Sequence, residues 1–63
     1  MIESVTYAVK LGPVRYEVAL NLRTDRVRVS DGKTYRELPL LGRVANAETA
    51  EQMAKEFAME RSS

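Results

Sequence analysis

The chain lacks several residue types on which protein chemistry commonly depends. None of its 63 residues is Cys, His or Trp. Without Cys no disulfide can form, and without Cys or His the usual zinc ligands are missing, so we expect neither metal nor cofactor. The same absence removes the usual neutral-pH base and the strongest nucleophile. A carboxylate pair would still need a cleft that raises one pKa, so the sequence predicts a non-enzymatic protein without catalytic residues.

Long apolar runs and a secretion signal are also missing. No stretch approaches the length of a transmembrane helix, and the first residues lack the basic and apolar regions of a signal peptide. We therefore expect a cytoplasmic protein that makes no membrane contact. A chain of 63 residues forms a single domain, 1–63, near the size at which one core is marginally stable. Because the sequence provides neither a disulfide nor a zinc site, further stability must come from packing or from assembly into a homodimer.

Apolar and polar residues alternate over three segments, which is typical of half-buried strands. The predicted strands cover about 4–11, 14–23 and 26–30. A loop at Gly12-Pro13 sets the apolar residues of the first segment opposite those of the second. A one-residue slip would send all of them to the other face, so the pattern specifies its own register. The opposed residues are Leu11 with Val14, Val9 with Tyr16, Tyr7 with Val18, and Val5 with Leu20.

The second loop decides how the third strand aligns with the second. A two-residue turn at Thr24-Asp25 predicts three opposed pairs: Leu22 with Val27, Leu20 with Val29, and Arg23 with Arg26. Like charges facing each other are destabilising unless an anion or water separates them. A four-residue turn is the alternative, and it would splay the two arginines apart.

The segment after Asp31-Gly32, a strong hairpin signal, is less regular. A two-residue turn would put Tyr35 on the polar face, whereas a three-residue turn would put it in the core. We favour the core, because a buried aromatic contributes more stability. Pro39 removes a ladder donor, so a fourth strand would be short and at an edge. The residues interpreted as an irregular crossover that covers one side of the core are Leu38, Leu40 and Leu41.

A helix is predicted from Asn46, a good N-cap, with Glu48 in its first turn. Thr49 with Gln52 offers an alternative start one turn later. The fold class is therefore α+β: a three-stranded antiparallel meander, with room for a short fourth edge strand, packed by one C-terminal amphipathic helix. The predicted core consists of Val5, Tyr7, Val9, Tyr16, Val18, Leu20, Val27, Val29, Met53 and Phe57.

Charge is divided unevenly along the chain. Residues 1–43 carry a net charge of +3 and residues 44–63 a net charge of −2, so the sheet is basic and the helix acidic. The planar fork of arginine suits phosphate and guanine, so the polar face of the sheet is a candidate DNA-binding surface. The alternative is an ordinary solvated sheet face. The candidate DNA-contacting residues are Arg15, Arg23, Arg26, Arg28, Lys10 and Asn21.

The spacing of several apolar residues also has a counterpart in known families. In the second strand Tyr16 is followed at alternate positions by Val18 and Leu20, and the residues that lead into and begin the helix are Val44, Asn46, Ala50 and Met53. In this pattern residues 14–58 resemble the three-strand-plus-helix DNA-binding domains of tyrosine integrases (the N-terminal arm-type domain) and of plant ethylene-response factors. The resemblance implies a sheet laid in the DNA major groove, and it implies contact roles for Arg15, Arg23, Arg26 and Arg28. The chain differs from those families in having an additional N-terminal strand.

We favour weak, non-enzymatic DNA binding through this Arg-bearing face, and a protein-interaction module is the alternative. In the predicted topology the first strand is an exposed edge with only Lys10 and its short length to protect it. Such an edge can recruit a partner strand or a second copy of itself. The alternative function is thus a phage- or plasmid-type inhibitor or regulator, or a homodimeric accessory protein, acting through this edge or through the region of Met59.

Overall fold

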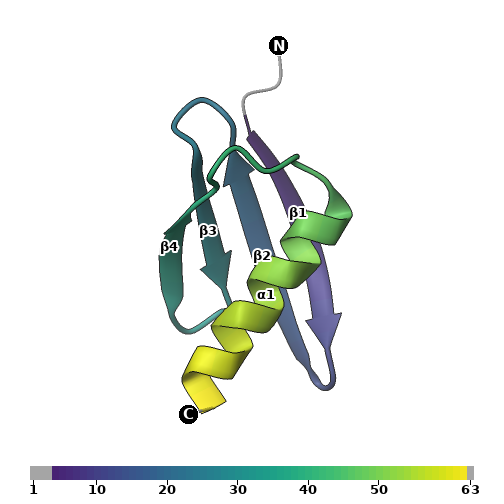
Figure 1. Cartoon of the computed structure of the whole chain (residues 1–63). Helices are drawn as coiled ribbons and strands as arrows, with labels where there is room; N and C mark the ends of the chain where they lie inside the picture. The colour runs from purple at the N-terminus through teal and green to yellow at the C-terminus, as the bar shows by residue number, and fades with distance from the viewer. Residues whose placement is uncertain (1–3, 63) are drawn as a thin grey trace.

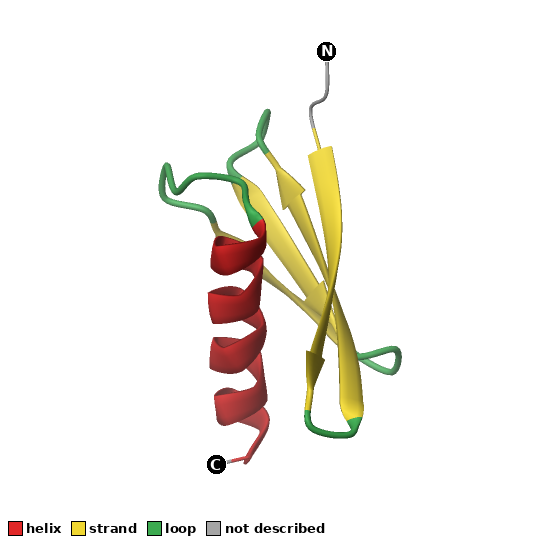
Figure 2. Cartoon of the chain, turned by 90° about the vertical axis from the view of Figure 1, so that its right-hand side faces the viewer, coloured by secondary structure: helices red, strands yellow, loops and turns green. Residues whose placement is uncertain are grey.

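The computed structural model describes residues 4–62, so residues 1–3, which bear on the secretion argument, and Ser63 lie outside the described residues. The elements are β1 (Ser4–Leu11), β2 (Val14–Asn21), β3 (Arg26–Ser30), β4 (Tyr35–Pro39) and α1 (Ala47–Ser62). The strands form one antiparallel sheet in the order β1-β2-β3-β4, and α1 lies against one side of it (Figures 1 and 2). The predicted α+β class is confirmed, including a short fourth strand at an edge. Within residues 4–62 no helix is long and apolar enough to cross a membrane.

The hairpin of β1 and β2 has the predicted register. Leu11 lies opposite Val14, and the pairing continues without interruption to Ser4 opposite Asn21. Gly12 has a φ of 63°, a left-handed conformation that glycine adopts without steric cost. A two-residue loop therefore closes this hairpin, and the alternating pattern places its apolar residues on the side that α1 covers.

The register predicted for the second hairpin is wrong by two residues. Leu20 lies opposite Val27 and Asn21 opposite Arg26, so residues 22–25 form a four-residue loop. The side-chain oxygen of Asn21 caps this loop, because it accepts hydrogen bonds from the backbone N–H of Arg23 at 3.0 Å and of Thr24 at 3.1 Å. The predicted opposition of Arg23 to Arg26 is therefore absent. A shift of two residues leaves the side chains that remain in the strands on their expected faces, but it moves Leu22, predicted opposite Val27, into the loop, where it is 46% exposed.

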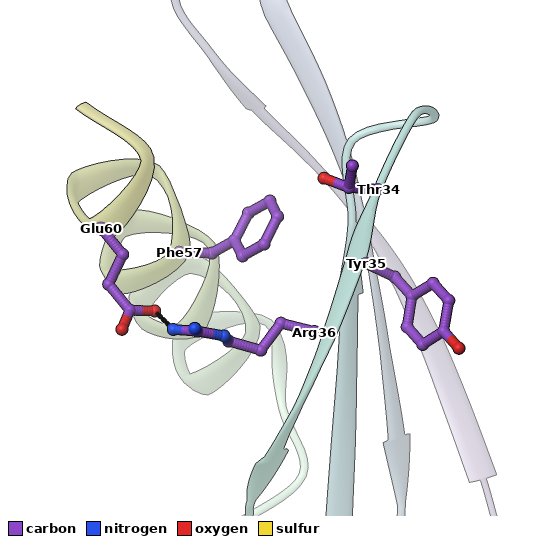
Figure 3. A pocket seen from close by; sticks show the side chains of 5 residues that line it. All are labelled: Thr34, Tyr35, Arg36, Phe57 and Glu60. Carbon is purple, nitrogen blue, oxygen red and sulfur yellow. Dashed lines mark hydrogen bonds and ion pairs between the residues drawn. The ribbon is translucent and has the colours of Figure 1, made fainter. Parts of the chain in front are cut away.

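The preference for a buried Tyr35 is also wrong. Residues 31–34 form another four-residue loop, which places Tyr35 opposite Ser30, and 63% of Tyr35 is exposed. The carboxylate of Asp31 caps this loop by accepting hydrogen bonds from the N–H groups of Lys33 and Thr34, both at 2.9 Å. The longer loop returns the chain with Tyr35 pointing away from the helix, as Figure 3 shows.

The crossover from β4 to α1 is tied to the loop between β2 and β3. Asp25 accepts hydrogen bonds from three successive backbone N–H groups, those of Leu40, Leu41 and Gly42, at 2.9 to 3.2 Å. Leu40 is buried in the core, as expected of the crossover, whereas Leu38 lies in β4 and not in the crossover as predicted. Leu41 has a positive φ of 58° and is 71% exposed, so its predicted contribution to core coverage is wrong.

The core lies between α1 and the two central strands. Asn46 is the N-cap of α1, since its side-chain oxygen accepts a 2.8 Å hydrogen bond from the N–H of Thr49. Phe57 packs edge-to-face on Tyr16, with ring centroids 5.9 Å apart. The predicted core residues of β1, namely Val5, Tyr7 and Val9, are only half-buried. The buried apolar residues are Tyr16, Val18, Leu20, Val27, Val29, Leu40, Ala50, Met53, Ala54 and Phe57.

Candidate nucleic-acid interface on the open face of the sheet

The side of the sheet opposite α1 is bare of any described element (Figure 2). We call it the open face. Directly opposed residues of an antiparallel sheet point to the same face, so the register defines its members. From β1 to β4 they are Ser4, Thr6, Ala8 and Lys10; Arg15, Glu17, Ala19 and Asn21; Arg26, Arg28 and Ser30; and Tyr35, Glu37 and Pro39.

Cationic side chains gather at the two ends of the open face. Lys10 and Arg15 lie directly opposite each other beside the Gly12-Pro13 turn. Arg26 and Arg28 lie on β3, toward the other end. Asn21, the residue of β2 that lies opposite Arg26, is six residues from Arg15, which corresponds to about 20 Å along the strand. The face therefore has two separate positive ends.

Ion pairing distinguishes Arg28 from the other three cations. No ion pair joins Lys10, Arg15 or Arg26 to any residue within 4–62. The opposition of Lys10 and Arg15 is unfavourable when no anion lies between them. A bound phosphate at this position would relieve that repulsion.

Arg28 is held in place by its neighbours on β4. Its guanidinium lies 4.8 Å from the ring centroid of Tyr35, and its Nη2 is 3.7 Å from Oε2 of the directly opposed Glu37. Both ionised side chains are more than half exposed, so the ion pair contributes little stability. The two contacts nevertheless restrict the orientation of the guanidinium over the open face.

Two further candidate residues lie at the margin of this surface. Arg23 is exposed within the loop at 22–25, beyond the end of β2. Asn21 lies on the open face, but its side-chain oxygen is engaged in capping that loop. The structure thus brings Lys10 together with Arg15, and Arg26 together with Arg28, and gives Asn21 a structural role that sequence reasoning did not assign.

The centre of the open face carries small side chains and one carboxylate. Thr6, Ala8 and Ala19 occupy adjacent positions on β1 and β2, and Glu17 lies between Ala8 and Ser30. Sequence reasoning left out Glu17 and Glu37, although the period of two places Glu17 on this face. The two glutamates reduce the net charge of the four cations to +2.

A separate hollow of about 240 Å³ lies between β4 and the C-terminal half of α1 (Figure 3). An ion pair between Arg36 and Glu60 crosses it, with Phe57 at its floor. Because these two charges neutralise each other, the hollow offers no net charge to a ligand. No group of three or more His, Cys, Asp or Glu side chains suited to a metal ion occurs in the described part of the chain.

Comparison of the chain with known protein families, with curated proteins and with solved structures found no match.

Proposed function

We propose that this protein is a small DNA-binding module that uses the open face of its sheet. The observation that carries the proposal is the placement of three cations at the two ends of one bare face, none of them in an ion pair with a described residue: Lys10, Arg15 and Arg26. Phosphate contacts from such side chains supply most of the affinity of a protein for nucleic acid.

The dimensions of the face suit a groove of duplex DNA. The two positive ends are about 20 Å apart, and the major groove is about 12 Å wide. The face is therefore long enough to span the groove, so that each end meets the phosphates of a different strand. The small side chains of Thr6, Ala8 and Ala19 between the ends allow the sheet to approach the groove closely. The resemblance of residues 14–58 to sheet-in-groove domains supports the same orientation. The acidic α1 lies on the far side of the sheet, away from the phosphates.

The proposal sets the strength and the salt dependence of binding. Lys10, Arg15, Arg26 and the partly neutralised Arg28 correspond to three or four phosphate contacts, so log affinity should fall with log salt at a slope of about −3. Glu17 and Glu37 oppose binding on the same face. We therefore expect dissociation constants in the micromolar range or weaker at physiological salt.

A pair of double variants with equal charge change tests the surface. Arg15→Ala with Arg26→Ala removes one cation from each end and should abolish measurable binding or reduce the salt slope by about two. Arg36→Ala with Arg43→Ala is the matched control, because both arginines form exposed ion pairs with α1 on the other side of the sheet. The control should change affinity by less than about twofold.

Backbone NMR with staged addition of duplex DNA at low salt locates the contact. Shifts confined to the open-face residues of β1, β2 and β3 are expected. Two results would overturn the proposal: no shift on β2 and β3 at low salt, or an equal loss of affinity in both double variants.

The edge of β1 favours the second candidate, a protein-interaction function. An eight-residue strand with unpaired backbone groups can add a strand from another chain. If the DNA titration fails, this function takes the place of the first.

A further inference from the structure

The apolar side chains of β1 are only partly covered by the rest of the protein. Val5, Tyr7, Val9 and Leu11 all point to the side that α1 covers, yet none of them is fully buried. On the neighbouring β2, by contrast, Tyr16, Val18 and Leu20 have at most 7% of their surface exposed. Figure 1 shows the cause, since α1 crosses the sheet diagonally, with its first turns beside β1 and its C-terminal end toward β4, and leaves uncovered the half of β1 that leads to the β1–β2 turn.

A hollow of about 280 Å³ opens along this part of β1. It lies between β1 and the first turns of α1, with Tyr7 and Val9 on the strand side and Ala47 and Glu51 on the helix side. The small side chain of Ala47 leaves the hollow open. A strand added beside β1 would direct alternate side chains into it.

Only one of the two sheet edges is protected against pairing. β4 has five residues and carries Arg36, Glu37 and Pro39, all features that discourage strand addition. β1 has eight residues, of which Lys10 alone is charged. The edge that can accept a strand is therefore that of β1, whose apolar side chains are only partly covered.

The turn at one end of β1 determines which backbone groups face outward. A two-residue turn closes on a hydrogen-bonded pair, here Leu11 with Val14, and bonded pairs alternate along an antiparallel ladder. Val9 then belongs to the bonded set that faces β2. Ala8, with Thr6 and Lys10, presents its N–H and C=O groups to the outer edge.

We infer that β1 pairs antiparallel with β1 of a second copy of this chain, about a two-fold axis at Ala8. In this register Ala8 faces Ala8 of the second copy, and the outward backbone groups of Thr6 face those of Lys10. The apolar residues then oppose one another without exception, Tyr7 with Val9 and Val5 with Leu11. Tyr7 and Val9 of each copy lie on the side where the hollow of the other opens.

Charge and symmetry favour a second copy over an unrelated peptide. A peptide would have to supply an apolar residue at every second position, whereas β1 already has this pattern and is self-complementary. The only charged residue of the strand, Lys10, meets Thr6 and not another lysine, so pairing opposes no like charges. The inference is independent of DNA binding, and its test contains no DNA.

Disulfide crosslinking tests the register directly. Because the chain has no Cys, a variant with one introduced Cys can form a disulfide only between copies. In the proposed register the two Ala8 Cα atoms are about 5.5 Å apart, within the range that a disulfide spans. Thr6 is the matched control on the same strand and face, and its two copies lie about 13 Å apart.

Under mild oxidation at micromolar concentration, Ala8→Cys should form about tenfold more covalent dimer than Thr6→Cys. Equal crosslinking of the two variants would indicate random collision and would overturn the inference.

Sedimentation of the unmodified chain and of two lysine variants supplies a readout that needs no oxidation. The unmodified chain should show a dimer fraction at micromolar concentration. Ala8→Lys places two like charges at the axis and should raise the dimer dissociation constant about fivefold. Met59→Lys adds the same charge at an exposed position of α1 and should leave it unchanged. A monomer that persists to millimolar concentration, or an equal effect of both variants, would overturn the inference.

Discussion

Truncation of Phe57 to Ala removes the largest side chain with which α1 contacts the sheet. Phe57 is only 4% exposed, and its ring packs edge-to-face on Tyr16 at a centroid distance of 5.9 Å. Loss of a buried Phe costs about 3–5 kcal/mol, to which the aromatic pair contributes about 0.5–1.5 kcal/mol. At roughly 0.05–0.15 kcal/mol per residue, a chain of 63 residues has about 3–9 kcal/mol of total stability. Phe57→Ala should therefore remove a third or more of it.

Urea denaturation followed by far-ultraviolet circular dichroism measures this loss. Met59→Ala is the control on the same helix, because Met59 is 72% exposed and its truncation should change stability by less than about 0.5 kcal/mol. We expect a much lower urea midpoint for Phe57→Ala, or a chain already unfolded without urea. An unchanged midpoint would show that α1 does not dock on the sheet through Phe57.

Two further variants test features that the tertiary structure alone revealed. Asp25→Ala should lower the free energy of unfolding by about 1–2 kcal/mol in urea, because its carboxylate accepts hydrogen bonds from Leu41 and Gly42. Asp25→Gly loses the same hydrogen bonds, but glycine adopts the φ of 57° found at position 25 without steric cost, so this variant should be more stable than Asp25→Ala. The reverse order of stability would contradict this account. Tyr35→Ala should cost less than about 1 kcal/mol, since it removes only an exposed stack on Arg28. A loss of about 3 kcal/mol in thermal or urea unfolding would instead indicate a buried Tyr35.

The candidate site could be predicted from the sequence only in part. The period of two placed Arg15, Arg26 and Arg28 on one face, and a register shift of two residues does not change that. The shift does change their neighbours, because Arg26 lies opposite Asn21 and Arg23 is carried into a loop. The pairing of Arg28 with Glu37 depends on β4, whose register follows from a loop length that periodicity does not specify.

The sequence by itself determined the features that arise from local repetition. Alternating apolar residues and the turn at Gly12-Pro13 specified the first hairpin, because any slip would expose the apolar face. The sequence also specified the helix and two candidate starts for it, Asn46 and Thr49, of which the structure has Asn46, whose side chain accepts a hydrogen bond from an N–H group of the first turn.

Only the tertiary structure decided the lengths of the other two loops and the course of the crossover. Turns of two, three or four residues are all compatible with the local sequence, and the free-energy differences between them are small. A single contact with a residue far along the chain can therefore decide the length of the loop. Asp25 makes such contacts, since it hydrogen-bonds residues that are 15 to 17 positions away in the chain. Whether Tyr35 is buried and whether Leu40 reaches the core depend on these loops, because each added residue redirects the following side chains.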